Sequence, residues 1–167
     1  MKKAVIILIS IVLILGCAGT SETAKSSEPS GGCAAPSKTY GNADVDNFLQ
    51  TSYTICTELQ EAKELLSEAN AFVADPAAYA AEKGVEAKAK LMSQVNAMIN
   101  SIPERILKKA GITLKGSGDV TSAAKNLAGM DKMKAIKDVN AAISNLKNAS
   151  ETAPKIVEEF NALLAKF

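Results

Sequence analysis

The stretch that decides the fold is DVDNFLQTSYTICTELQEAKELLSEANAFV, residues 44–73. Its apolar and small residues recur at alternating steps of three and four, which is the spacing of one face of an α-helix. Asp44 suits the N-cap, because its carboxylate can accept hydrogen bonds from the first backbone N–H groups. The pattern therefore predicts one long amphipathic helix. Its stripe consists of Val45, Phe48, Ser52, Ile55, Leu59, Ala62, Leu66, Ala69 and Val73.

A second long stripe runs to the end of the chain and contains Pro154. Proline inside a helix removes a backbone hydrogen bond and costs about 3 kcal/mol. We therefore expect a kink, or two nearly collinear helices that meet at Thr152 or Ala153. This stripe consists of Ile136, Val139, Ile143, Leu146, Ser150, Ala153, Val157, Phe160, Leu164 and Phe167.

Between the two stripes, the chain has shorter helical segments. Asp75-Pro76 ends the first helix and starts a second one, because Asp can cap a helix and Pro suits its first turn. The second helix is expected over residues 76–100, with Gly84 as a weak point. Its apolar side consists of Tyr79, Leu91, Val95, Met98 and Ile99.

More breaks are predicted beyond residue 100. Ser101-Ile-Pro-Glu104 has the spacing of a capping box and predicts the start of a short helix, which Gly111 ends. Gly116-Ser-Gly118 predicts a loop, with Ser117 or Asp119 as the cap of the next helix.

These elements predict an all-α fold, an antiparallel up-and-down bundle of four to five helices over residues 44–167. Short breaks favour antiparallel neighbours. The composition agrees, since the 167-residue chain has only seven aromatic residues and is rich in the helix formers Ala, Lys and Glu. We expect a monomer, because Asp75-Pro76 and Gly116–Gly118 offer places for the chain to reverse. The absence of His excludes a Ser-His-Asp triad, an HExxH zinc site and a His-ligated haem.

The N-terminus carries a targeting signal. Lys2 and Lys3 precede an apolar run, residues 4–15, which is typical of a secretory signal peptide. A membrane-spanning helix would need about 20 apolar residues. The run ends in Ile14-Leu15-Gly16-Cys17, which resembles the lipobox of bacterial lipoproteins: an aliphatic residue, a tolerated residue, a small residue and Cys. The resemblance covers residues 1–17 only; the alternatives are an ordinary signal peptide or an uncleaved anchor.

The resemblance implies that Cys17 receives a diacylglyceryl thioether, that cleavage follows before Cys17, and that the new amine is acylated. Buried acyl carbons contribute about 0.8 kcal/mol each, so two or three chains anchor firmly. Ala18 in place of Asp implies, in enteric-type bacteria, sorting to the outer membrane. We therefore expect a signal peptide at residues 1–16, and a lipidated Cys with a flexible linker, rich in Ser and Gly, at residues 17–43.

Cys33 and Cys56 are the other two cysteines. Secretion places them in a compartment that permits disulfides. A bond between them would close a loop of about 24 residues and stabilise the fold by about 3 kcal/mol in the loop-entropy account. The alternatives are two unpaired thiols or a bond between chains. A catalytic Cys would need a base, and no His is present to serve as one.

Charge is distributed unevenly along the chain. Residues 44–75 carry seven acidic residues and one basic residue, and residues 105–137 carry eight basic and two acidic residues. The basic segment either complements the acidic helix within the bundle or forms a basic face toward anionic lipid, lipopolysaccharide or an acidic partner. Without interleaved aromatic residues, we do not expect nucleic-acid binding. The basic residues are Arg105, Lys108, Lys109, Lys115, Lys125, Lys132, Lys134 and Lys137.

Two further groups of side chains have plain structural interpretations. Four glutamates of the first helix lie off its stripe, so we predict that they face water and bind no metal or cofactor. Four methionines fit apolar helical positions and are predicted to fill the core. The glutamates are Glu58, Glu61, Glu64 and Glu68, and the methionines are Met92, Met98, Met130 and Met133.

The sequence therefore predicts a non-enzymatic lipoprotein of the cell envelope that binds another macromolecule or supports the envelope. We expect it at the outer membrane, facing the periplasm or the surface. The alternative is a helical carrier of a lipid or other apolar ligand. A large cavity lined by Leu91, Val95, Ile143 and Leu146 would favour the carrier, and a filled core with an exposed apolar patch would favour partner binding.

Overall fold

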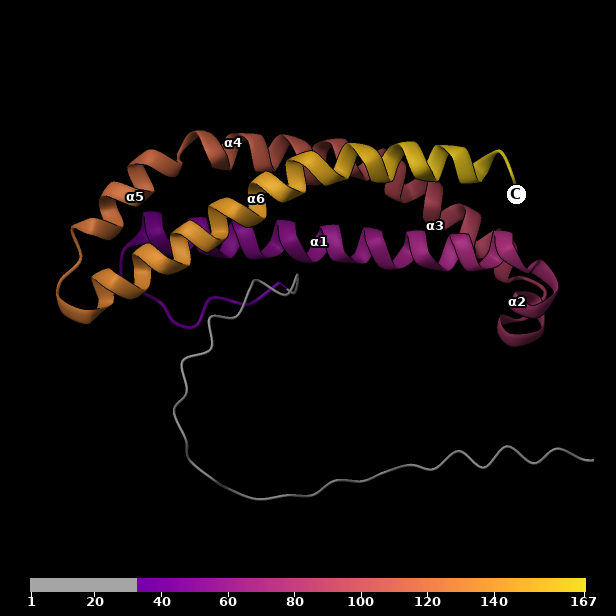
Figure 1. Cartoon of the computed structure of the whole chain (residues 1–167), viewed down its shortest axis with the longest axis horizontal. Coiled ribbons are helices and arrows are strands. Elements are labelled where there is room, and N and C mark those ends of the chain that lie inside the picture. The colour runs from indigo at the N-terminus through magenta and orange to yellow at the C-terminus, as the bar shows by residue number, and fades with distance from the viewer. Residues whose placement is uncertain (1–32) are drawn as a thin grey trace, which may run out of the picture. The chain divides into compact units, whose positions relative to one another are not determined.

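The computed structural model describes residues 33–167, so the predicted signal peptide and the lipobox with Cys17 lie outside the described residues. The described chain is a bundle of helices in which no strand occurs, and this all-α fold is the one predicted (Figure 1). No helix among these residues is long and apolar enough to cross a membrane. The elements are α1 (Ala43–Ala74), α2 (Pro76–Lys83), α3 (Ala87–Ile102), the π-helical segment η1 (Pro103–Lys108), α4 (Lys109–Lys115), α5 (Ser117–Lys125) and α6 (Gly129–Leu164).

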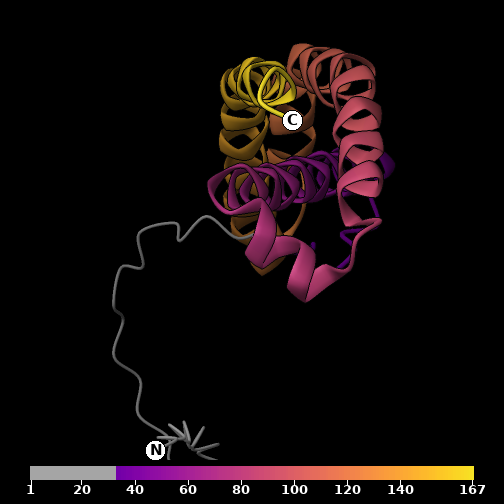
Figure 2. The ribbon, with the colours of Figure 1, turned by 90° about the vertical axis from the view of Figure 1, so that its right-hand side faces the viewer.

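The helices form an up-down-up arrangement. α1 runs in one direction, α3 to α5 return along it as one curved rod, and α6 runs again in the direction of α1 (Figure 1). The end view shows these parts packed around one core (Figure 2). The first reversal follows Asp75-Pro76, as predicted. The second reversal was predicted at Gly116–Gly118, but Gly116 keeps right-handed helical dihedrals and α5 begins directly after it. The chain reverses instead at residues 126–128, just before Gly129, whose φ is +59°.

The predicted second helix is divided into α2 and α3. Gly84 has a φ of +94°, a conformation that side-chain-bearing residues rarely adopt, and it terminates α2. The break predicted at Ser101 is wrong, because the chain stays helical through η1 and α4. The Ser101 hydroxyl donates to the Met98 carbonyl, 3.0 Å away, within the helix instead of capping a new one. Gly111 also lies within α4 and does not end a helix.

The start of α1 is capped by Asn42, and the prediction of Asp44 as the cap is wrong. The Asn42 side-chain oxygen accepts from the backbone N–H groups of Asp44 and Val45, each 3.1 Å away. This pair of bonds satisfies two of the N–H groups that a helix start leaves without a partner.

The folded unit begins before the predicted boundary at residue 44. Residues 33–42, which we call the strap, are attached to α1 by a bond between Cys33 and Cys56, whose Sγ atoms lie 2.10 Å apart. Tyr40 of the strap is buried, and its hydroxyl donates to the Asp138 carboxylate of α6 at 2.6 Å. Burial, helped by this bond to a carboxylate, raises the pKa of Tyr40 to about 12. The strap therefore belongs to the bundle, although its residues were expected to be part of a flexible linker over residues 17–43.

The stripe predicted for α1 forms most of its buried face. Leu66 and Val73 are only partly buried, whereas Leu49 and Phe72 are buried in addition. The predicted residues that are buried are Val45, Phe48, Ser52, Ile55, Leu59, Ala62 and Ala69.

α6 is one continuous helix that contains Pro154, so the alternative of two helices meeting at Thr152 or Ala153 is wrong. Figure 1 shows this helix changing direction along its length, while Pro154 stays inside it. Its buried residues follow a regular three-four repeat. Within α6, every second residue of the predicted stripe is buried as expected, and at the alternate positions the buried residue is the one directly before the predicted residue. The buried residues are Ala135, Val139, Ala142, Leu146, Ala149, Ala153, Ile156, Phe160 and Leu163.

Small residues allow α1 and α6 to approach closely. Ser52 of α1 is buried, and its hydroxyl donates to the Ala142 carbonyl of α6 at 3.1 Å. Larger predicted members of the stripe, such as Ile136 and Ile143, flank this seam and are partly buried. The alanines of α6 therefore form part of the core.

The methionine prediction is wrong at two of its four positions. Met98 packs against the core and Met92 is partly buried. Met130 and Met133, at the start of α6, are 77% and 72% exposed.

Candidate functional site

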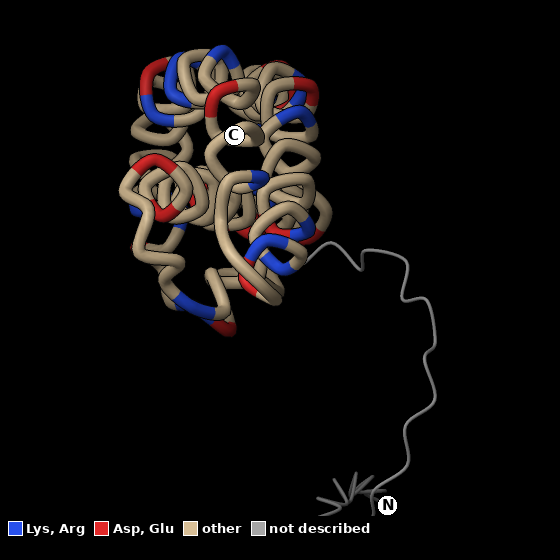
Figure 3. Tube along the Cα trace, turned by 90° about the vertical axis from the view of Figure 1, so that its left-hand side faces the viewer, with Lys and Arg blue, Asp and Glu red and all other residues tan. Residues whose placement is uncertain are grey.

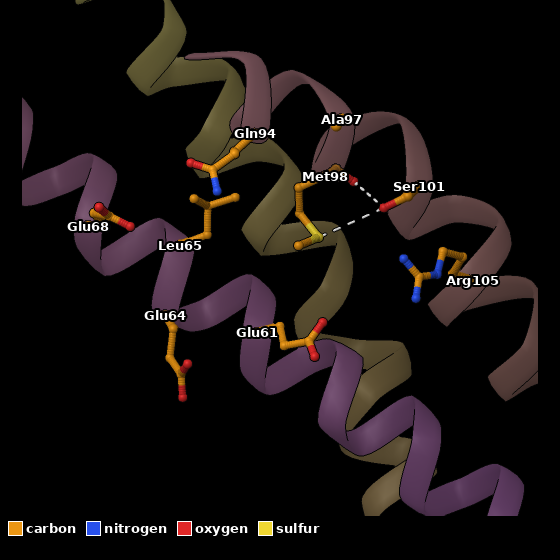
Figure 4. Close-up of a pocket in the computed structure, with 9 residues that line it drawn as sticks. All are labelled: Glu61, Glu64, Leu65, Glu68, Gln94, Ala97, Met98, Ser101 and Arg105. Atoms are coloured by element: carbon orange, nitrogen blue, oxygen red, sulfur yellow. Dashed lines mark hydrogen bonds between the residues drawn. The ribbon is translucent and has the colours of Figure 1, made fainter. Parts of the chain in front are cut away.

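A surface groove of about 510 Å³ lies between α1 and the rod formed by α3 and η1 (Figure 4). Leu65 and Met98 supply apolar lining, and both pack against the core. Carboxylates line its α1 side, and Arg105 of η1 lies at one end. We call it the acidic groove; its lining residues are Glu61, Glu64, Leu65, Glu68, Gln94, Ala97, Met98, Ser101 and Arg105.

The spacing of the three carboxylates explains their common location. Glu61, Glu64 and Glu68 are separated by three and four residues, so α1 presents them along one side. Glu64 accepts from the Gln60 amide at 3.1 Å, and Glu68 accepts from the Tyr79 hydroxyl at 2.6 Å. Among residues 33–167, no Lys or Arg forms an ion pair with any of the three. The groove therefore presents negative charge that the described chain leaves without a paired cation.

Arg105, which lines the groove, forms an ion pair with Glu58. Arg105 donates to one oxygen of Glu58 from both Nε and Nη2, at 3.1 Å and 2.7 Å. The Glu58 side chain is 12% exposed, and its other oxygen, Oε2, is buried without a hydrogen-bond partner in the described chain. The prediction that all four glutamates face water is therefore wrong for Glu58, which joins α1 to η1.

A second hollow, of about 830 Å³, adjoins the acidic groove and shares Glu68 and Gln94 with it. Its lining includes Lys83 and Lys90. Tyr79 is buried beside it, and burial together with the bond to Glu68 raises its pKa to about 12. Tyr79 therefore holds Glu68 in place at the junction of the two hollows.

The predicted basic residues lie on η1, α4, α5 and α6. Arg105 and Lys108 are engaged with Glu58 and Glu104. The other six are exposed and are spread over α4, α5 and α6. Of the ion pairs among the described residues, the one between Arg105 and Glu58 alone joins the acidic segment 44–75 to the basic segment 105–137.

The residues tied to the carrier alternative lie in the core. Leu91, Val95 and Leu146 are almost completely buried, and Ile143 is partly buried against the same cluster. None of these four lines either of the two hollows described above.

The described residues hold no group of three or more His, Cys, Asp or Glu side chains placed to bind a metal ion. Cys33 and Cys56 are joined to each other, and Cys17 lies outside the described residues.

Sequence reasoning missed the acidic groove. The spacing of Glu61, Glu64 and Glu68 beside the apolar Leu65 was its visible signal, but the opposing wall comes from residues about 30 positions away. Only tertiary packing brings Gln94 and Ser101 opposite these carboxylates.

Comparisons of the chain with protein families, with curated proteins and with solved structures find no match.

Proposed function

We propose that this chain is a lipid-anchored lipoprotein of the bacterial cell envelope whose helical bundle binds a partner protein through the acidic groove. The proposal is for a non-enzymatic role. Anchoring would come from Cys17, on the strength of the lipobox resemblance, and Ala18 favours the outer membrane, with the bundle facing the periplasm or the surface.

The observation that carries the binding role is the acidic groove. It combines an apolar lining, from Leu65 and Met98, with three carboxylates that have no ion pair among residues 33–167. Such a surface is complementary to a segment that carries Lys or Arg beside an apolar side chain, because charge complementarity steers association and apolar contact holds the complex. The carrier alternative lacks a comparable observation, since the residues expected to line its cavity are packed in the core.

Crosslinking in native membranes, followed by purification of the protein, tests the proposal. The groove variant combines Glu61→Lys and Glu64→Lys, both at exposed positions. Its matched control combines Glu158→Lys and Glu159→Lys, which make the same charge change on exposed positions of α6. We expect wild type and control to capture the same partner, and the groove variant to lose it.

A Cys17→Ser form separates anchoring from binding. Because an uncleaved signal peptide would still hold the chain in the membrane, this form is exported behind an ordinary cleavable signal peptide. We expect it to leave the membrane fraction while it still binds the partner in solution. Capture of the same partners by wild type and groove variant would contradict the proposed binding site.

A further inference from the structure

The start of α6 exposes two large apolar side chains. Met130 and Met133 are 77% and 72% exposed, and they lie three residues apart, so they share one side of the helix. The other large exposed apolar residues of the described chain lie elsewhere: Val85 between α2 and α3, and Ile112 on α4. Two neighbouring methionines in water form an apolar pair that the core does not use.

Four exposed lysines lie close to this pair in sequence. Lys134 and Lys137 follow Met130 by four and seven residues, so they lie on the same outward side of α6. Lys132 lies between the methionines in sequence, and Lys125 ends α5 just before the turn. All four are exposed, and none forms an ion pair within the described part of the chain. We call these four lysines, with Met130 and Met133, the α6 tip.

The acidic residues of this part of α6 are engaged by the strap. Asp131 forms an ion pair with Lys38. Asp138 accepts from the Tyr40 hydroxyl at 2.6 Å and lies 3.4 Å from the Ser37 hydroxyl. The strap therefore draws both carboxylates to one side and leaves the outward side with Lys and Met. Figure 3 faces this end of the molecule, with Lys and Arg blue and Asp and Glu red.

We propose that the α6 tip is a docking surface for an anionic phospholipid membrane. Lysines within a Debye length of such a membrane are attracted to its headgroups, and their long apolar stems allow the charge to stay in water while the stem contacts lipid. Unbranched, flexible methionines can enter the boundary between headgroups and acyl chains.

A flat lipid surface fits the tip better than a peptide does. None of the tip residues lines the acidic groove or the hollow beside it. The tip also lacks Trp, Tyr and Arg, the side chains that most often anchor protein–protein interfaces. The proposed lipid on Cys17 would keep the bundle near a membrane, but the tip's own affinity does not depend on that lipid.

A tryptophan reporter tests this docking directly, because the chain contains no Trp. The mature chain from residue 17, with Cys17→Ser so that no acyl chain is attached, carries Met133→Trp. With phosphatidylglycerol vesicles, we expect a blue shift of the emission that disappears at about 1 M salt, where the Debye length is about 3 Å. With phosphatidylcholine vesicles, we expect no shift.

Val85→Trp in the same background is the matched control, because Val85 is 90% exposed and lies between α2 and α3. We expect no shift from it. The absence of a shift from Met133→Trp, or an equal shift from both reporters, would overturn the proposal.

Charge variants give a second, independent readout. Replacement of Lys132, Lys134 and Lys137 by Gln should lower partition into phosphatidylglycerol vesicles by about tenfold or more. The matched control replaces Lys147, Lys155 and Lys166, which are also exposed, by Gln and should retain binding. Equal losses of vesicle binding in both variants would overturn the proposal. The tip would instead be a protein-binding surface if the chain bound no vesicles and only the first variant lost a crosslinked protein partner. These variants leave the acidic groove intact, so this test and that of the proposed function can fail separately.

Discussion

Replacing Phe160 by Ala tests whether the bundle is held together within one chain. Phe160 lies on the buried face of α6 and has no exposed surface. A buried aromatic side chain removes about 150–250 Å² from water, which corresponds to about 4–6 kcal/mol at 25 cal/mol per Å². The remaining Ala carbon lowers this loss and the cavity raises it, so we expect Phe160→Ala to reduce the free energy of unfolding by about 3–5 kcal/mol.

Urea denaturation followed by circular dichroism measures this change. With an m-value of about 2 kcal/mol per M, the midpoint should fall by roughly 2 M. Met133→Ala is the control on the same helix, because Met133 is largely exposed and its replacement should change stability by no more than about 0.5 kcal/mol. The loss should not depend on protein concentration. A loss from Phe160→Ala as small as that of the control would contradict the packing described here, and a midpoint that rises with concentration would indicate packing between chains.

Three other changes have defined outcomes. Cys56→Ser should lower the free energy of unfolding by about 2–4 kcal/mol, because it opens the loop that Cys33 closes; peptide mapping without reduction should show the linked pair in wild type, and alkylation of both thiols without reduction would contradict it. The free energy of unfolding should fall between pH 10 and pH 12, because the pKa of Tyr40 and Tyr79 is about 12 in the folded state whereas the unfolded state releases these protons near pH 10. Urea titrations at each pH measure this decline, which Tyr40→Phe should make less steep. An unchanged dependence of the free energy on pH in that variant would count against the buried phenol. Cys17→Ser should abolish labelling by radioactive fatty acid and leave the precursor uncleaved, whereas normal labelling would exclude Cys17 as the lipid site.

Hydrophobic periodicity was sufficient to predict the long helices. The stripe of α1 is buried at most of its positions because large aliphatic residues recur with helical spacing. The buried alanines of α6 could not be identified from sequence. Alanine has a high helix propensity at any helical position, so its occurrence does not distinguish a core position from a surface position. Ala135, Ala142 and Ala149 are buried, and the close approach of α1 that makes them useful is a property of the packed pair.

Breaks within the chain were harder to predict from sequence. Asp75-Pro76 does separate two helices, whereas the similar signals at Ser101 and Gly111 do not. Local capping preferences contribute only about 1 kcal/mol, so burial of Ile102, Ile106 and Ala110 along one rod can override them.

The strap and the acidic groove could not be predicted from sequence because both depend on residues distant along the chain. Tyr40 is held by Asp138, 98 positions away. Glu58 lies off the apolar stripe of α1, which indicates exposure, but Arg105 covers it from η1. The sequence did indicate the chemistry of these segments, including the pairing of Cys33 with Cys56 and the acidic character of α1.

Site-specific photo-crosslinking at Gln94 tests the binding role most directly, because Gln94 lines both the acidic groove and the hollow beside it. A photoreactive phenylalanine analogue would replace Gln94 in cells, and Asn148, at an exposed position of α6, would serve as the control site. We predict a protein adduct from position 94 that disappears with Glu61→Lys and Glu64→Lys, and no such adduct from position 148. The same adducts from both positions, or an adduct at position 94 that persists after the charge reversal, would contradict the account.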